Sequence, residues 1–320
     1  MTELIASPAD IKEISFDVVT GGVLFGTHDE DNIIVKVYRS AREEDGLEDI
    51  DANVNLDKNG VVSITSFSPA FEFSSCQFSY VEVLFPSDLT KQINPVKVTG
   101  QVNAGFVELG FLSNLGEVQL NVDLGGIEID GVNADSIEVQ NGLGYIDAKA
   151  IFALKHAKFA VQTGSVRTHY ITTPEFEALT EYGTSWNIET YTDKATVHTE
   201  YGYATMLRPT HFTVNQDQSV SVSTLYGKSL VSYDLMYDVE FNVDGEYGEH
   251  IVVYDNECEL DEEQEEEDPA ALIGTCPFET FEPVTQVKVF TTYGHSSFLQ
   301  NEPDTEDLQY YPESDDIILN

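Results

Sequence analysis

The chain has 320 residues, 41% of them hydrophobic, and a formal net charge of −42 at pH 7. This length and apolar content are enough for a sizeable core, which excludes a chain that is disordered throughout. A surface with 57 acidic and 15 basic residues repels nucleic acid and anionic membranes and favours cations and basic partners. We therefore expect no nucleic-acid partner, and we interpret the acidity either as a solvated surface or as a sign of cation binding.

The N-terminal sequence MTELIASPAD has neither the basic nor the apolar region of a secretion signal. No run reaches the roughly 20 apolar residues of a membrane span. We expect no membrane span, and a cytoplasmic location by default. The alternative is the cell surface or the extracellular space, if the chain is processed or is anchored by a partner.

The first 95 residues contain short alternating apolar segments separated by acidic connectors. β-Branched and aromatic residues dominate these segments, which is typical of strands. We expect residues 1–95 to form a β cap that protects the first edge of the structure that follows. The predicted strands are Ile14–Val19, Val23–Phe25, Ile33–Tyr38, Val61–Thr65 and Phe78–Phe85.

Residues 96–300 contain a glycine that recurs at a nearly constant spacing. The separations are 19–21 residues, except for 25 before Gly227 and 46 before Gly294. Apolar residues alternate with polar ones on both sides of each glycine, which predicts two strands with one buried face, joined at a glycine corner. The corner glycines are Gly105, Gly125, Gly144, Gly164, Gly183, Gly202, Gly227, Gly248 and Gly294.

A unit of about 20 residues cannot bury its apolar face alone, so successive units must stack. The spacing predicts an all-β chain over residues 96–300, built as a single-stranded β-solenoid or β-helix-like stack of ~20-residue rungs. An antiparallel sandwich is the main alternative, although its turns usually recur every 8–12 residues.

Two acidic segments interrupt or follow the repeat. Residues 255–268 contain ten acidic residues and no basic one, and we expect a solvated acidic insertion there. The 46-residue interval then holds one or two rungs together with this insertion. Residues 301–320 are predicted to be an acidic C-terminal tail, either disordered or docked as a strand through Ile317, Ile318 and Leu319 on its own last rung or on a neighbour.

A tyrosine precedes each corner glycine in the second half of the repeat. If the rungs are in register, these tyrosines form a stacked column. Such a column either pins the register of the rungs or presents an exposed stripe for binding a sugar or a protein partner. The residues are Tyr182, Tyr201, Tyr226, Tyr247 and Tyr293.

Several stretches resemble the putative-adhesin family of unknown function, whose repeats have the form strand, Thr-Gly-Ser-Gly, strand. The resemblance covers roughly residues 14–170, and it implies a β-solenoid-like fold without catalytic residues to carry over. The chain departs from the family pattern in its tyrosines before the glycine, its acidity and its lack of a visible membrane anchor. The matching stretches are FDVVTGGVLFG (Phe16–Gly26), VEVLFP ending at Pro86, VNAGFVEL, LGGIEIDG, NGLGYIDA and QTGSVRTH.

Signatures of enzyme chemistry are missing from the sequence. No GxSxG esterase motif and no glycine-rich phosphate loop before a helix occurs. The four arginines make a poor groove for an acidic polysaccharide. The three cysteines, Cys76, Cys258 and Cys276, lack metal-ligand spacing, and Cys258 with Cys276 is compatible with a disulfide or with a reduced pair. The histidines show no ligand motif, and we expect surface or turn positions for them: His28, His156, His169, His198, His211, His250 and His295.

Two charged groups are candidate binding residues. Asp29, Asp31, Glu43 and Glu44 offer oxygen ligands for a possible Ca²⁺ ion, although their order does not match an EF-hand loop. A basic cluster is either a solvated face or a patch complementary to the acidic loop of another copy. Its members are Lys149, Lys155, Lys158, His156 and Arg167.

The sequence therefore favours a non-enzymatic structural or interaction protein that self-associates into filaments or a surface layer through open sheet edges. The alternative is a cation- or carbohydrate-binding, adhesin-like module that uses the acidic loops or the tyrosines. A polysaccharide-processing enzyme is a third hypothesis.

Overall fold

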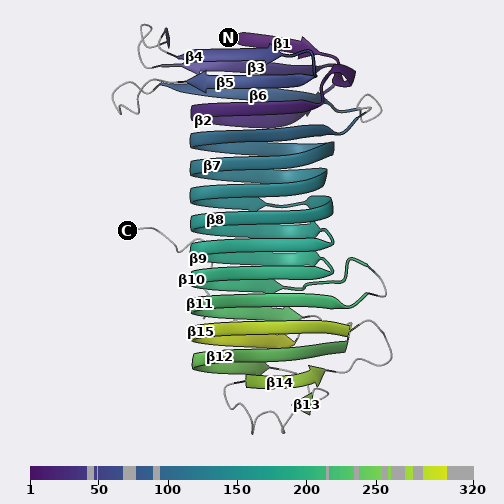
Figure 1. Ribbon diagram of the computed structural model, residues 1–320, viewed down its shortest axis with the longest axis vertical. Coiled ribbons are helices and arrows are strands. Elements are labelled where there is room, and N and C mark those ends of the chain that lie inside the picture. Colours follow the sequence, from purple (N-terminus) through teal and green to yellow (C-terminus); the bar gives the residue numbers. More distant parts are fainter. Residues whose placement is uncertain are drawn as a thin grey trace.

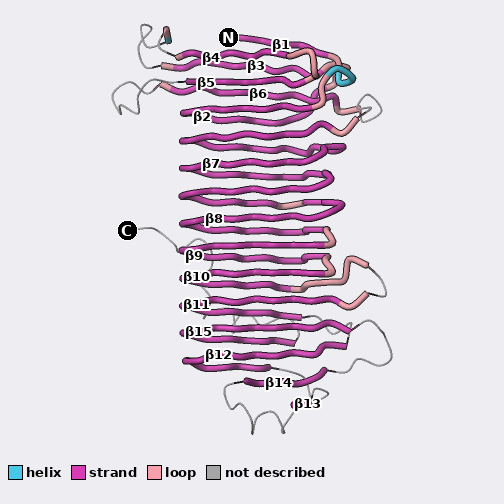
Figure 2. Tube along the Cα trace, viewed as in Figure 1, coloured by secondary structure: helices cyan, strands magenta, loops and turns pink. Residues whose placement is uncertain are grey.

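The computed structural model describes residues 1–41, 47–48, 50–67, 77–88, 94–213, 216–233, 238–253, 259–260, 271–276 and 284–300. Nearly all of these residues form β-strands (Figure 2). The described residues contain no α-helix, and the cyan coil near the N-terminus is a 3-10 turn. The prediction of an all-β chain is confirmed. The elements are β1 (Thr2–Ala6), the 3-10 turn η1 (Pro8–Asp10), β2 (Glu13–His28), β3 (Ile33–Ser40), β4 (Asp51–Leu56), β5 (Val61–Phe67), β6 (Phe78–Pro86), β7 (Val96–Ala148), β8 (Ile151–Thr172), β9 (Glu175–Tyr191), β10 (Lys194–Leu207), β11 (Gln218–Tyr233), β12 (Asp238–Val253), β13 (Glu259–Leu260), β14 (Ala271–Cys276) and β15 (Val284–Gln300).

The strands form one continuous sheet, stacked along a single long axis (Figure 1). Its order is β1-β3-β6-β2-β7-β8-β9-β10-β11-β15-β12-β14-β13, and β5 and β4 extend it beside β2. From β2 to β12 the pairing is parallel, and each corner glycine lies opposite the corner glycine of the next strand. The repeat seen in the sequence is therefore an in-register parallel repeat.

The corner needs glycine for two reasons. Eight of the nine corner glycines, together with Gly21 in β2, have φ between +136° and +148°, which side-chain-bearing residues rarely adopt. A Cβ on Gly125 would also overlap the carbonyl oxygen of Gly105, which lies directly beneath it. Because both glycines belong to β7, this long strand turns back and pairs with itself.

The core is formed by the inward-facing side chains of successive strands. Along β10, Ala195, Val197 and Thr199 are buried while Lys194 and Glu200 are exposed, as the period-two pattern predicts. The same alternation continues from Ile14 in β2 to Phe298 in β15, which produces one contiguous apolar core.

The order of the last strands corrects one expectation from the sequence. The units do not stack in chain order, because β15 lies between β11 and β12 (Figure 1). The 46-residue interval therefore contains no further rung of the parallel stack among its described residues. Instead it supplies β13 and β14, which pair antiparallel on the outer side of β12.

Antiparallel strands cover both ends of the parallel stack. At the N-terminal end, β5 and β6 pair with successive halves of β2, and β4, β3 and β1 then add in antiparallel orientation. At the other end β14 pairs with Val239–Asp244 of β12, and β13 pairs with β14. Strand β2 also pairs in parallel with β7, so the sheet continues without a break across the predicted boundary at residue 95.

Some predicted features lie outside the described residues. These are the tail 301–320 with Ile317, Ile318 and Leu319, and the acidic insertion 255–268 apart from Glu259–Leu260. Cys276 is disulfide-bonded, so it is not part of a reduced pair. The cysteine that it joins lies outside the described residues.

Candidate ligand-binding surface

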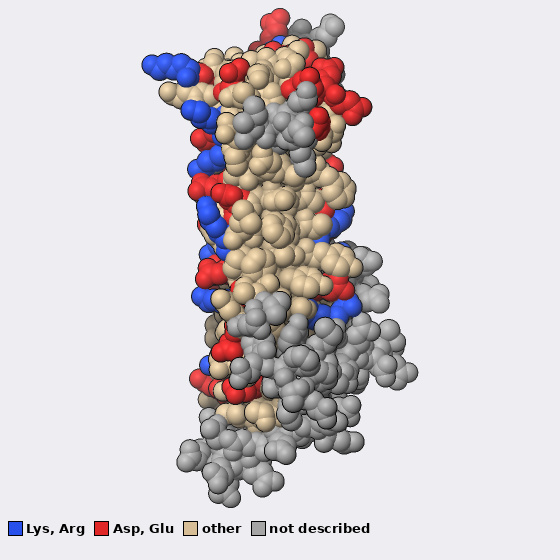
Figure 3. Space-filling model, turned by 90° about the vertical axis from the view of Figure 1, so that its right-hand side faces the viewer, with Lys and Arg blue, Asp and Glu red and all other residues tan. Residues whose placement is uncertain are grey.

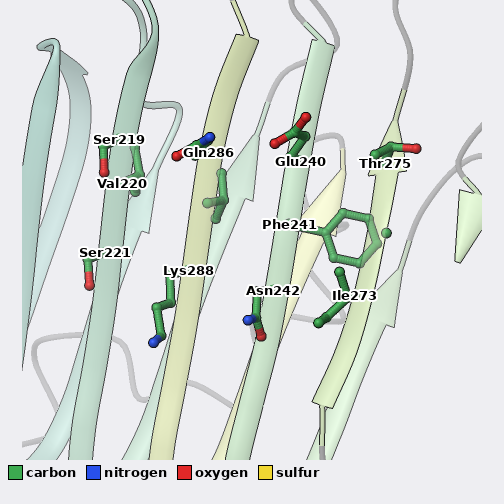
Figure 4. A pocket seen from close by; sticks show the side chains of 12 residues that line it. Ser219, Val220, Ser221, Glu240, Phe241, Asn242, Ile273, Thr275, Gln286 and Lys288 are labelled. Atoms are coloured by element: carbon green, nitrogen blue, oxygen red, sulfur yellow. The ribbon is translucent and has the colours of Figure 1, made fainter. Parts of the chain in front are cut away.

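A groove on the described surface crosses β11, β15, β12 and β14, and it has a volume of about 650 Å³ (Figure 4). The parallel register arranges its side chains in two rows. One row contains Ser219, Gln286, Glu240 and Thr275, and the other contains Ser221, Lys288, Asn242 and Ile273.

The rows follow from strand geometry. Neighbouring strands lie about 4.8 Å apart, and residues on one face of a strand recur every two positions, about 6.7 Å. The buried residues Val220, Val287 and Phe241 lie between the rows and point into the core. The outward side chains therefore form a regular grid of hydroxyl, amide, carboxylate and ammonium groups, with Ile273 as an apolar member.

Among the residues that line the groove, Asn242 has an unmet hydrogen-bonding group. Its side-chain oxygen is buried and finds no hydrogen-bond partner in the described part of the chain. A buried amide oxygen without a donor is unfavourable by about 1–3 kcal/mol.

The five tyrosines form the column predicted from the sequence, in the spatial order Tyr182, Tyr201, Tyr226, Tyr293, Tyr247. Successive ring centroids are 4.8–5.0 Å apart, and the ring planes differ by only 3–7°. The stacking prediction is confirmed. The rings remain 40–61% exposed, so the column, here called the tyrosine ladder, lies on the outer surface beside the glycine corners.

Two tyrosines of the ladder have a raised pKa. Burial raises the pKa of Tyr201, and the neighbouring tyrosines and the carboxylates Glu200 and Glu181 raise it further. The pKa of Tyr293 is raised in the same way, with Glu246 as the nearby carboxylate. Carboxylates therefore lie close to these two hydroxyls.

The basic cluster is neutralised by acids on adjacent turns of the chain. Lys149 lies 2.7 Å from Asp130, and Lys155 lies 3.3 Å from Asp135. His156 lies 3.0 Å from Glu138 and Lys158 lies 2.5 Å from Glu177, whereas Arg167 is exposed next to Trp186. Figure 3 shows the same mixture of signs, with red and blue side by side along one edge of the stack. The paired members contribute little net positive charge to the surface.

The calcium hypothesis gains no support from the described residues. No group of three or more His, Cys, Asp or Glu side chains in the described ranges could hold a metal ion. Asp29 accepts a hydrogen bond from Ser87 Oγ at 3.3 Å. Glu43 and Glu44 lie outside the described residues.

His211 is an exception to the expected surface position of the histidines, since it is only 7% exposed. Its Nε2 lies 2.7 Å from Thr285 Oγ1, and its Nδ1 lies 2.9 Å from the Gln216 carbonyl oxygen. Tyr233 donates to Gln218 Oε1, and Gln218 Nε2 donates to the Thr192 carbonyl oxygen. This buried network joins β11, β15 and the loop before β11, a structural role that the sequence does not reveal.

Sequence reasoning also missed the groove residues Glu240, Asn242, Gln286 and Lys288. Their period-two positions identify them as outward-facing, which is the only signal available. Their grouping depends on β15 lying beside β12, and the chain order does not reveal that.

No helix in the described part of the chain has the length and apolar character needed to cross a membrane. No family model matches the chain, and no curated protein matches its sequence.

Several solved structures resemble the fold weakly. A putative lipid binding protein from Parabacteroides distasonis has a TM-score of 0.47 at 12% identity, over 94% of this chain and 96% of that one. A putative adhesin from Bacteroides fragilis has a TM-score of 0.42 at 9% identity, over 93% and 96%. A putative cell adhesion protein from Clostridium sporogenes has a TM-score of 0.29 at 8% identity, over 94% and 99%. Because these TM-scores lie below 0.5, the resemblance assigns no function to this chain.

Proposed function

We propose that this chain is a non-enzymatic interaction protein, built as a β-solenoid, that binds a neutral carbohydrate in the groove across β11, β15, β12 and β14. The supporting observation is the grid of outward side chains at fixed spacing. Amide, carboxylate and hydroxyl groups at such spacing match the neighbouring hydroxyls of a sugar ring, which both donate and accept hydrogen bonds.

Charge supports a neutral ligand over an acidic one. The chain carries a net charge of −42, which repels anionic polymers. Lys288 lies in the groove, and Glu240 sits on the adjacent strand one row away, so opposite charges are both present. A ligand with many hydroxyls can hydrogen-bond to both groups without bringing a charge of its own.

Isothermal titration with a panel of neutral oligosaccharides tests this proposal. We expect at least one sugar to bind, and Glu240→Ala with Gln286→Ala to weaken it by about tenfold or more, because each hydrogen bond to a charged group is worth about 1.5–3 kcal/mol. The matched control is Lys194→Ala. Lys194 is an exposed residue on β10 that pairs with Ser219, so it continues the same row of side chains beyond the groove. If the panel shows no binding, or if the control weakens binding equally, the proposal is wrong.

Self-association is the second candidate, because the sheet has edge strands at β1, β4 and β13. These edge strands are short, with five, six and two residues. Short edges offer few backbone hydrogen bonds to a second copy, and we therefore rank filament formation below ligand binding. Filaments in negative-stain images of the full chain would reverse this ranking.

A further inference from the structure

The tyrosine ladder exposes ring edges and not ring faces. Each inner ring, such as Tyr226, has Tyr201 on one side at 5.0 Å and Tyr293 on the other at 4.8 Å, with nearly parallel planes. The exposed 41% of Tyr226 is therefore its edge and its hydroxyl. Within the ladder, the end rings Tyr182 and Tyr247 each have only one face covered by another ring.

This geometry disfavours the usual stacking of a sugar or of a compact cation on an aromatic face. It favours a different contact. The parallel ring edges form a ridged apolar surface, against which the face of a planar molecule packs through dispersion contacts. Five parallel edges in a row offer such a contact to a planar aromatic molecule lying along the stack.

The length of the ladder favours an elongated ligand. Five rings at the strand spacing span about 20 Å along the axis of the stack. The ladder is held by five paired strands, so it is already ordered before any ligand binds. A rigid planar molecule would lose little conformational freedom on binding to it.

The carboxylates beside the ladder favour a positively charged ligand. Glu181, Glu200 and Glu246 each directly precede a ladder tyrosine in the chain, and they act on the hydroxyls of Tyr201 and Tyr293. Lys228 lies past the glycine corner, 6.0 Å from the ring of Tyr203. The ladder side of the corner is therefore dominated by carboxylates.

We propose that the tyrosine ladder is a binding site for elongated, planar aromatic cations, which lie along the stack against the ring edges with their charge near the flanking carboxylates. The site is independent of the sugar groove. Tyr226 and Ser221 are five residues apart on one strand, which places them about 17 Å apart.

Thioflavin T, a planar benzothiazole cation whose fluorescence rises when its rings are held coplanar, is a suitable probe. We expect saturable fluorescence with the full chain. Tyr226→Leu interrupts the ladder at its centre and should weaken dye binding by about tenfold or more. The matched control, Tyr191→Leu, removes a tyrosine of the same 41% exposure outside the ladder and should leave dye binding unchanged.

Two further variants separate binding from folding. Tyr226→Phe keeps the ring edge and should retain the dye, and Tyr247→Leu shortens the ladder only at its exposed end and should weaken binding partially. Circular dichroism melting of each variant identifies any loss of fold. Unchanged dye affinity in a folded Tyr226→Leu protein would overturn the proposal.

The charge preference has its own test. Glu181→Gln with Glu200→Gln should weaken thioflavin T by about threefold or more at low salt, and it should leave an uncharged benzothiazole of the same shape unaffected. Equal affinity for an anionic planar dye would contradict the preference for cations. The groove variants Glu240→Ala and Gln286→Ala should bind dye normally, so failure of the sugar proposal and failure of this one are distinguishable.

Discussion

At the scale of single residues, each corner of the chain has two characteristic positions. One is the glycine and the other is the residue that precedes it. The glycine is required by backbone conformation and by the carbonyl oxygen of the turn beneath it. The tyrosine before it is not required sterically, because Thr163 occupies the same position opposite Tyr182. The sequence predicted both features, since the spacing of glycines and tyrosines is visible without a structure. It could not predict which part of each ring stays exposed.

The glycine requirement predicts a large loss of stability for Gly202→Ala. The new Cβ would overlap the carbonyl oxygen of Gly183 at a φ of +139°. We expect the free energy of unfolding to fall by about 3 kcal/mol or more. Gly116→Ala is the control, because a Cβ there meets its neighbours at 3.7 Å and should change stability little. Urea unfolding followed by circular dichroism measures both, and equal midpoints for the two variants would refute the argument.

The ladder predicts that an inner tyrosine stabilises more than an outer one. Tyr226 stacks on two rings and Tyr247 on one. Each stacked pair is worth about 0.5–1.5 kcal/mol, so Tyr226→Ala should lower the free energy of unfolding by roughly that amount more than Tyr247→Ala. The comparison uses the same unfolding measurement. A larger loss for Tyr247→Ala would show that stacking is not the main contribution.

At the scale of elements, the strand order was the feature that sequence reasoning could not supply. Strands β11, β15 and β12 share the same Tyr-Gly corner and similar alternation, so each could pair with either of the others. What distinguishes the true order is the buried network around His211, because Thr285 at the start of β15 meets His211, Gln218 and Tyr233 from the neighbouring segment. Contacts between residues so distant in the chain leave no periodic signal.

The same network predicts a pH dependence of stability. Burial lowers the pKa of His211, while the Gln216 carbonyl and the charges of Asp193 and Asp217 act against that shift. The neutral ring therefore stabilises the fold fully above the ordinary histidine pKa of about 6.5, and this contribution is lost as the pH falls below that value.

We expect the urea midpoint of the full chain to fall between pH 7.5 and pH 5.5, before most carboxylates titrate. His211→Gln should be less stable at pH 7.5 and should show a flatter dependence over this window. If both proteins lose stability in parallel, another group is responsible for the effect.

At the scale of the whole molecule, the ends of the sheet decide whether copies of the chain can join. A parallel in-register stack would present its full edge to the next copy if it ended abruptly. Here the edge strands are the antiparallel strands β1, β4 and β13, which come from the two segments that lack the glycine repeat. The sequence indicated a cap at the N-terminal end, but the strands covering the other end arise from a region in which we expected only a solvated loop and one or two rungs.

This protection predicts the effect of removing β1. Deletion of residues 1–6 would expose β3, an eight-residue strand with the apolar residues Ile33, Ile34, Val35 and Val37. We expect the shortened chain to show a molecular mass in light scattering that rises with concentration, and the full chain to show a constant one. Glu3→Ala is the control, since it keeps β1 while removing the charge that lies 4.0 Å from Lys36. Filaments formed by the full chain would show that β1 does not block the edge, and self-association would then become the leading function. If the full and the shortened chain both keep the same constant mass, β1 does not protect the edge.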